Sequence, residues 1–151
     1  MADKERRNVC KNRRAKHTFE LFEHLEAGLI LTGSEVKSLR NGKGNLEEAY
    51  VGFDDKGRPM LLSAHIGPYE QANRQNHEAL RPRPLLMSLS EIRRMRARVR
   101  ERGLTLVPLQ MYFVGPWCKL EFAVGRGRKL HDKREALREK EDRRETSRAG
   151  R

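Results

Sequence analysis

The amino-acid sequence predicts a mainly β protein built around a small antiparallel barrel. Apolar and polar residues alternate with a period of two in several segments of the first 125 residues, as expected for strands that bury one face. Turn signals follow one another about every ten residues, and the repeated strand-helix-strand pattern of a parallel sheet is absent. An OB-fold-like antiparallel barrel, decorated by two or three short helices and followed by a basic tail, fits these observations best.

A chain of 151 residues is long enough to bury one modest hydrophobic core, so we expect a single domain with charged extensions. The predicted parts are a mobile basic N-terminal segment at 1–16, a barrel body at 17–125 and a basic tail at 126–151. The tail is almost wholly charged and has few apolar residues to bury. It should therefore be disordered when free and take its shape from a partner.

The first half of the body reads as two short strands and a helix. Period-two alternation begins at His17 and continues to 23, and the apolar run 29–31 follows a small Ala-Gly pair. Ser34 is the predicted cap of a short helix whose Val36 and Leu39 share one face and which ends at Asn41-Gly42.

A hairpin is predicted next, from strands at 49–53 and 59–66 around the turn at 54–57. Residues 67–84 are too polar for the core and should form a loop, after which 85–87 re-enters the core. Ser90 is the predicted cap of a helix with Ile92, Met95 and Val99 on its buried side. Strands at 104–114 and 118–124, joined by a tight turn at 115–117, complete the barrel.

The aromatic residues divide into two predicted groups. The core should take Phe19, Phe22, Phe53, Phe113 and Phe122. The side chains freer to stack on a ligand are Tyr50, Tyr69, Tyr112 and Trp117. With so few aromatic rings, recognition of a nucleic acid should depend more on shape and phosphate contacts than on a row of stacked bases.

The net charge of +12 is concentrated in blocks. Segments 1–17, 81–102 and 126–151 together carry +16, which leaves the rest of the chain at −4. Blocks of one sign bind polyanions through phosphate contacts and release of counterions. Nucleic acid is therefore the first candidate partner, ahead of a membrane surface.

Other functional classes lack their sequence signals. No apolar run reaches the length of a transmembrane helix, and the N-terminus lacks the apolar segment of a secretion signal, so we expect a cytoplasmic protein with no membrane partner. Cys10 and Cys118 are expected as free thiols, and the five histidines show no metal-ligand spacing. Phosphate-loop, dinucleotide-binding and serine-nucleophile motifs are absent. We therefore predict no enzyme, no cofactor and no metal.

Several linked motifs follow one another along the chain: Asn12-Arg13-Arg14-Ala15-Lys16-His17, Glu26-Ala27-Gly28-Leu29, 33–46, 65–71, Asn76-His77, Arg81-Pro82-Arg83, 91–94, 103–109 and Asp132-Lys133-Arg134. Through them the chain resembles the SmpB family of SsrA-binding proteins over about residues 12–145. The shared order and spacing of these motifs are more specific than any one motif. Pro84 departs from the lysine of many relatives, and His131 replaces the tyrosine of some members.

The resemblance implies an OB-like, RNA-binding adaptor that catalyses no reaction, binds the tRNA-like part of transfer-messenger RNA (tmRNA, SsrA) and accompanies it to stalled ribosomes for trans-translation. It implies the ribosome's decoding centre and ribosomal RNA as partners, elongation factor Tu as an indirect one through aminoacylated tmRNA, and a monomer. The tmRNA-facing positions that it implies are Asn12, Arg13, Arg14, Lys16, His17, Glu26, Lys37, Arg40, Leu86 and Lys119. Leu86 could equally be a core residue.

The family's tail becomes helical in the empty mRNA channel. The tail residues that the resemblance assigns to the decoding centre and channel are Gly127, Arg128, Lys129, His131, Asp132, Lys133 and Arg134. Two alternatives stay open: a structural ribosomal or ribosome-assembly protein whose basic blocks fill RNA crevices, and, behind it, a metal-dependent nuclease.

Overall fold

A computed structural model describes residues 6–100 and 103–128. Its main sheet is antiparallel throughout and contains seven strands. These strands are β1 (Arg6–Lys11), β2 (Phe19–Leu29), β4 (Tyr50–Phe53), β5 (Pro59–Leu62), β7 (Arg83–Leu86), β8 (Leu104–Val114) and β9 (Trp117–Gly127). The short strands β3 (Gly44–Asn45) and β6 (His65–Ile66) pair separately.

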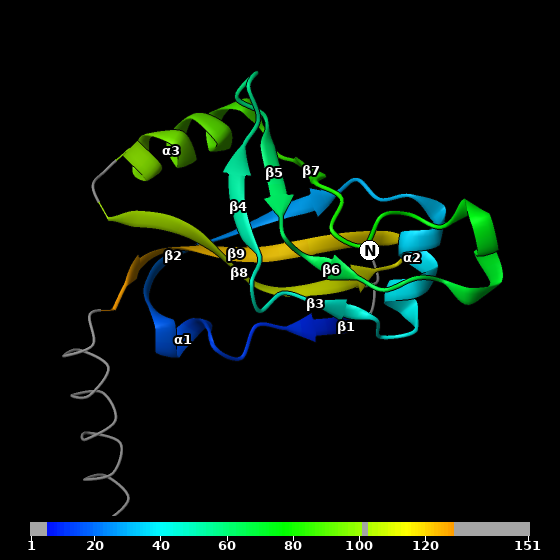
Figure 1. The fold of residues 1–151 in the computed structure, drawn as a ribbon. Coiled ribbons are helices and arrows are strands. Elements are labelled where there is room, and N and C mark those ends of the chain that lie inside the picture. The colour runs from blue at the N-terminus through cyan, green and yellow to red at the C-terminus, as the bar shows by residue number, and fades with distance from the viewer. Residues whose placement is uncertain (1–5, 101–102, 129–151) are drawn as a thin grey trace, which may run out of the picture.

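Six of these strands close into a ring. The order runs β8-β4-β5-β7-β2-β9, and β9 pairs back with β8, while β1 adds to the outer edge of β8. The long strands β2, β8 and β9 cross the centre of the molecule in Figure 1 and carry most of the barrel wall. The predicted mainly β class and OB-fold-like antiparallel barrel are confirmed.

The N-terminal segment departs from its prediction. Residues 6–11 form a strand along β8, from Arg6 opposite Val114 to Lys11 opposite Gln110, instead of remaining mobile. Val9 and Cys10 pack against the core, and the backbone N–H of Asn12 donates to Leu109 O at 2.7 Å. The prediction of a mobile segment failed because local sequence cannot show that β8 offers an edge for this strand to pair with.

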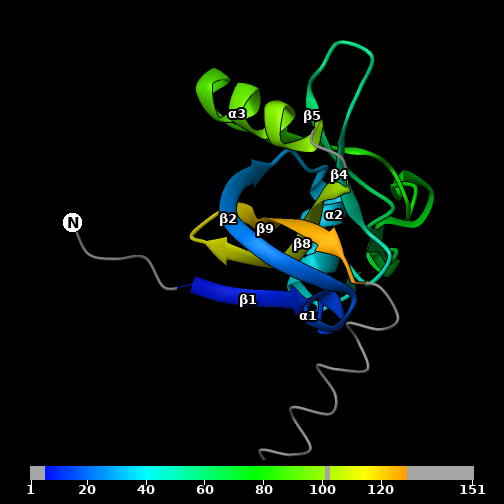
Figure 2. The ribbon, with the colours of Figure 1, turned by 90° about the vertical axis from the view of Figure 1, so that its left-hand side faces the viewer.

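Strand β2 is a second correction. The chain does not break between 23 and 29 but runs as one curved strand that wraps the barrel (Figure 2). The register with β9 shifts between Leu21 and His24, and such an irregularity bends a strand without ending it.

Three α-helices and one 3₁₀ helix decorate the barrel in the described residues: α1 (Ala15–Thr18), α2 (Gly33–Arg40), α3 (Leu89–Arg100) and η1 (Glu70–Gln75). In Figure 1, α2 lies at one end of the barrel and α3 near the other. The predicted caps were each two residues late. Thr32 forms a reciprocal capping box with Glu35, and the Ser88 hydroxyl accepts from the Glu91 N–H at 3.3 Å while donating to its carboxylate.

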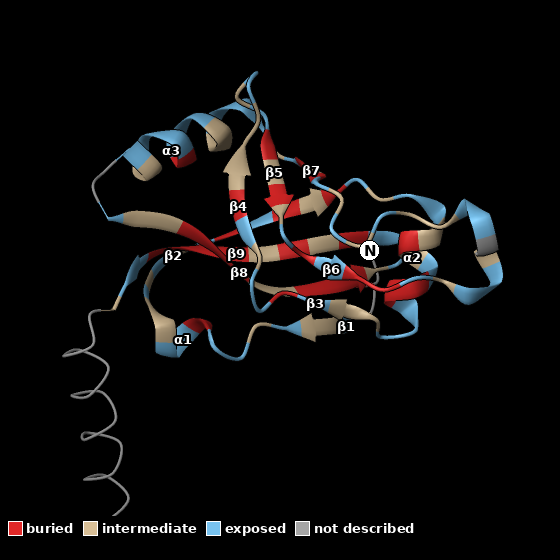
Figure 3. Cartoon of the chain, viewed as in Figure 1, coloured by how far each residue is buried: buried red, intermediate tan, exposed pale blue. Residues whose placement is uncertain are grey.

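The core lies inside the ring and under α2 and α3. Strand residues such as Leu61, Phe113 and Phe122 are fully buried, as are Leu39 of α2 and Met95 of α3, and the buried positions run along the barrel interior in Figure 3. Two aromatic predictions were wrong. Phe22 is 41% exposed, and Tyr112 is only 2% exposed.

A buried ionic cluster joins α2 to β7 and to the loop before it. The Glu35 carboxylate accepts from Arg83 Nε at 2.6 Å and from Arg81 Nη2 at 2.6 Å, and neither Glu35 nor Arg83 reaches solvent. Arg83 also donates to Ala64 O at 2.6 Å and Ala79 O at 3.1 Å. Although burial disfavours the ionised carboxylate, hydrogen bonds from Arg81, the Thr32 N–H and Arg83 lower the pKa of Glu35 to about 2.

The boundary between body and tail also differs from the predicted one. Gly127 pairs with Phe19 at the end of the β2–β9 ladder, and the Arg128 N–H donates to Thr18 O at 2.9 Å. The body therefore continues to 128 and not to 125. No helix within 6–100 and 103–128 is both long and apolar enough to cross a membrane.

Candidate nucleic-acid interface

The outer surface of β2, β9 and β8 carries polar side chains, because alternate residues of a strand point to opposite faces. We call this surface the polar sheet face. It consists of His24, Glu26, Gln110, Tyr112, Lys119 and Glu121, with Arg6 of β1 beside them. The register holds the set together, since Glu26 lies opposite Glu121 and Tyr112 lies opposite Lys119.

Glu26 is held ionised at the centre of the face. The Tyr112 hydroxyl donates to its Oε2, and Lys119 Nζ donates to its Oε1 at 2.9 Å. The hydrogen bond from Tyr112 is the largest cause that lowers the pKa of Glu26, and Lys119 adds to it. Burial and the same hydrogen bond raise the pKa of Tyr112. The side chains of Glu26 and Lys119 remain 49% and 37% exposed, so this pair is open to a ligand.

Glu121 is the second acceptor on the face. His24 Nδ1 lies 3.1 Å from its Oε1, while Gln110 Nε2 donates to its Oε2 and Arg6 Nη2 lies 3.5 Å from the same oxygen. Burial opposes ionisation, but hydrogen bonds from Gln110 and His24 keep the pKa of Glu121 below its ordinary value. Arg6 also stacks on Tyr112, 3.7 Å from the ring centroid, and so links the two carboxylates.

The first predicted motif follows β1. Asn12 fastens the loop to β8, because its Nδ2 donates to Pro108 O at 3.0 Å in addition to the backbone bond described above. Arg13, Arg14, Lys16 and His17 are all exposed around α1. Asn12 therefore shapes the loop that presents four cationic or titratable side chains to solvent.

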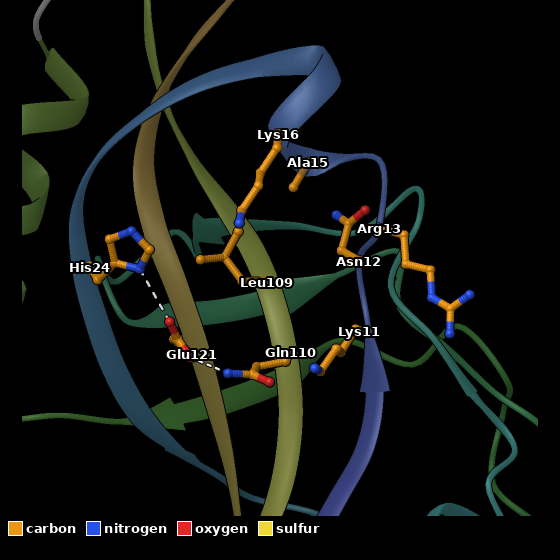
Figure 4. A pocket seen from close by; sticks show the side chains of 9 residues that line it. All are labelled: Lys11, Asn12, Arg13, Ala15, Lys16, His24, Leu109, Gln110 and Glu121. Atoms are coloured by element: carbon orange, nitrogen blue, oxygen red, sulfur yellow. Dashed lines mark hydrogen bonds and ion pairs between the residues drawn. The ribbon is translucent and has the colours of Figure 1, made fainter. Parts of the chain in front are cut away.

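This loop and the polar sheet face enclose a cleft of about 390 Å³, which we call the β1-α1 cleft. Figure 4 shows its two walls: His24, Glu121 and Gln110 on one side, and the loop with Asn12 and Arg13 on the other, with Leu109 between them. Its lining residues are Lys11, Asn12, Arg13, Ala15, Lys16, His24, Leu109, Gln110 and Glu121.

Leu86 lies on the surface and not in the core, with 59% of its area exposed. It sits opposite Gly28 of β2, where an added Cβ would come into van der Waals contact with the Leu86 Cβ at 3.4 Å. Leu86 and Lys119 line a second cleft of about 460 Å³ together with Trp117, which is 64% exposed.

Lys37 and Arg40 lie on the exposed surface of α2. Arg40 stacks 4.4 Å above the Phe113 ring, and Lys37 lies 5.5 Å from the Tyr69 ring. Val36 of the same helix lines the cleft of Leu86 and Trp117. The helix thus borders the polar sheet face at its other end.

The fold brings the sequence-predicted residues into three neighbouring groups: the motif at 12–17, the trio Glu26, Lys119 and Leu86, and the cations of α2. Gly127 and Arg128 belong to the barrel, as described. The predicted tail positions Lys129, His131, Asp132, Lys133 and Arg134 lie outside the described residues.

Sequence reasoning missed Arg6, His24, Gln110 and Glu121 of the same surface. Period two placed them on strands or in loops without showing that they face each other, because cross-strand register depends on long-range pairing. The alternation of His24 with Leu25 and of Glu121 with Phe122 was the available signal.

The described residues contain no group of three or more His, Cys, Asp or Glu side chains that could hold a metal ion. Within the same residues the thiols of Cys10 and Cys118 are free, and burial raises their pKa to about 11 and about 12. These thiols are therefore protonated at neutral pH.

Comparison with known proteins gives concordant results. The model of the SmpB protein family matches residues 9–151. An SsrA-binding protein of Desulforudis audaxviator is 47% identical over 100% of this chain and 98% of its own length. Another, from Symbiobacterium thermophilum, is 50% identical over 93% of this chain and 89% of its own. A chain from a solved structure described as "tmRNA-SmpB: a journey to the center of the bacterial ribosome" superposes with a TM-score of 0.70 at 41% identity, covering 87% of this chain and 95% of that one.

Proposed function

Since this chain belongs to the SmpB family, we propose that it is a cytoplasmic RNA-binding adaptor that binds the tRNA-like part of tmRNA and delivers it to stalled ribosomes for trans-translation. The observation that carries the proposal is the likeness, in sequence and fold together, to the SmpB chain of a solved tmRNA-SmpB structure. The adaptor catalyses no reaction itself.

The chemistry of the surface supports RNA binding. Exposed cations frame the polar sheet face at both ends, Arg13, Arg14 and Lys16 on one side and Lys37 and Arg40 on the other. Cations at separated points contact phosphates and fix the orientation of an RNA. Between them lie hydrogen-bonding side chains and exposed apolar ones.

The centre of the face suits bases and sugars better than phosphates. The Glu26 carboxylate accepts hydrogen bonds, so it can take them from base amino groups or 2′-hydroxyls, as can Glu121. The exposed Trp117 ring and Leu86 offer an apolar surface on which a base can stack. We therefore assign Glu26, Lys119 and Leu86 to the contact with the tRNA-like part of tmRNA.

We further propose a division of labour along the chain. The body through 128 binds tmRNA, and residues 129–151 act in the ribosome's decoding centre and empty mRNA channel. Lys129, His131, Asp132, Lys133 and Arg134 are the first tail residues to enter it. Elongation factor Tu joins through aminoacylated tmRNA, and the protein acts as a monomer.

A competition experiment tests the proposal. Labelled tmRNA is bound to the full chain at physiological salt and challenged in turn with unlabelled tmRNA, with transfer RNA and with an unrelated structured RNA. We expect tmRNA alone to displace the label at concentrations near the dissociation constant. Equal displacement by all three RNAs would refute specific binding and favour the structural ribosomal protein, in which charge blocks alone drive association.

A further inference from the structure

We propose that the β1-α1 cleft is a binding pocket for one unpaired guanine of the bound RNA, with the Glu121 carboxylate as the residue that recognises its Watson–Crick edge. The inference rests on the proposed function, because it specifies how the RNA is read at this surface. It adds a base-specific contact from residues that the tmRNA-facing motifs do not include.

The cleft has the size and walls that a base requires. Its volume of about 390 Å³ lies within the range of about 300–1,000 Å³ typical of small-molecule sites. Leu109 and Ala15 supply apolar surface in the lining, and the His24 ring, 53% exposed, stands at its wall. Unpaired RNA bases are held in this way, between apolar or ring surfaces, with polar groups at their edges.

The polar groups select among the four bases. A carboxylate offers two adjacent acceptors, and guanine is the base whose Watson–Crick edge presents two adjacent donors, N1–H and the N2 amino group. Cytosine and adenine present one amino donor next to a ring acceptor, and uracil presents one imino donor between two acceptors. Guanine O6, next to N1, is an acceptor and suits a cation such as Lys16 on the opposite side of the cleft (Figure 4).

The exposure and the hydrogen bonds of Glu121 agree with its proposed recognition of guanine. Its side chain is 25% exposed and lines the cleft, so a ligand in the cleft can reach it. Of its three partners Gln110, His24 and Arg6, Gln110 keeps its hydrogen bond and holds the carboxylate in one orientation, which reduces the entropy lost when a base binds. His24 and Arg6 are themselves exposed and can turn to the ligand when the base displaces them.

Basic side chains at the rim of the cleft can bind the phosphates on either side of the base. Lys11, Arg13 and Lys16 are exposed and line the same cleft. A carboxylate among these cations would weaken non-specific phosphate binding, since like charges repel. Its presence is therefore better explained by recognition of base donors than by general attraction of RNA.

The test compares three short single-stranded oligouridines that differ only at the central nucleotide, which is guanosine, inosine or uridine. Inosine lacks the N2 amino group but keeps N1–H and O6. For the full chain at low salt, we expect the guanosine oligonucleotide to bind about tenfold more tightly than the uridine one, with inosine between them.

The matched variants are Glu121→Gln and Glu47→Gln. The amide of the first keeps the size of the side chain but replaces one acceptor by a donor, so the preference for guanosine over inosine should disappear. Glu47 is exposed and is not among the residues that line the cleft, so its variant should retain the full preference. His24→Ala opens one wall and should reduce the preference while leaving the carboxylate in place.

Each readout is a ratio of two affinities measured on the same sample, so a partly unfolded variant still gives a valid answer. Equal binding of the three oligonucleotides by the unmodified chain, or an undiminished guanosine preference in Glu121→Gln, would overturn the proposal. If the unmodified chain lacks this preference but still selects tmRNA in the competition experiment, only the guanine pocket fails and the adaptor function stands.

Discussion

Replacing Glu35 by glutamine should destabilise the protein through a charge imbalance in its interior. The variant keeps the shape of the side chain but leaves the buried Arg83 guanidinium without its counter-ion, and Arg81 loses the same partner. Removing one member of a buried ion pair typically destabilises by about 3–5 kcal/mol. Since the amide can still accept one hydrogen bond, we expect about 3 kcal/mol, or a fall in Tm of roughly 10 °C.

The pH dependence supplies an independent estimate. The pKa of Glu35 is lowered from an ordinary value of 4.5 to about 2 in the folded protein, and this difference corresponds to roughly 3 kcal/mol. Because the folded-state pKa is the lower one, this stabilisation is complete above the ordinary value and is lost as pH falls from there toward 2. The stability difference between the unmodified chain and Glu35→Gln should therefore be full at pH 7 and shrink on acidification.

Urea unfolding followed by circular dichroism, measured from neutral pH down to the acid limit of the folded state, tests both statements. Glu47→Gln serves as control, because Glu47 is an exposed carboxylate and its substitution should change stability by less than about 0.5 kcal/mol. A difference for Glu35→Gln below about 1 kcal/mol, or one that stays constant with pH, would refute the assignment of a buried, ionised carboxylate.

The remaining predictions concern RNA binding and the tail. Arg14→Ala and Lys119→Ala should each reduce the salt dependence of tmRNA binding by about one unit or less in the log–log slope, and an unchanged slope would mean that the side chain meets no phosphate. Leu86→Ala should change the free energy of unfolding in urea by no more than about 0.5 kcal/mol, because Leu86 is 59% exposed, but it should weaken tmRNA binding in a filter assay. A loss of stability typical of a core leucine would contradict the surface position of Leu86. Tyr112→Phe should destabilise by about 1.5–3 kcal/mol through loss of the hydrogen bond to the Glu26 carboxylate, and the loss should vanish in a Glu26→Ala background, which offers the hydroxyl no acceptor. Deleting residues 129–151 should leave Tm and the affinity for free tmRNA nearly unchanged while abolishing rescue of stalled ribosomes. Deletion from Gly127 onward should also lower Tm, because residues 127 and 128 are hydrogen-bonded to β2 and to the residue before it. A large fall in Tm for the deletion of 129–151 alone would show that the tail belongs to the folded body.

Much of the fold followed from local pattern. In the β8–β9 hairpin the bounds of β8 were predicted correctly and those of β9 to within one residue at its start and three at its end, because alternation over a long run and a Gly-Pro turn are both local signals. Met95 was correctly placed on the buried side of α3, since helical periodicity needs no knowledge of the partner surface. The caps were displaced because Thr32 and Ser34, like Ser88 and Ser90, offer equivalent hydroxyls two residues apart.

The sequence by itself determined the fold class, the blocks of positive charge and, through linked motifs, the family, because these depend on residue identity and short-range order. The tertiary structure alone decided which polar residues meet. Edge pairing with β8 ordered the N-terminal strand, barrel closure buried Glu35 with Arg83, and the β2–β9–β8 register set Glu121 beside His24 and Gln110. These contacts join residues far apart in the chain, and their energy depends on burial and geometry that no local pattern contains.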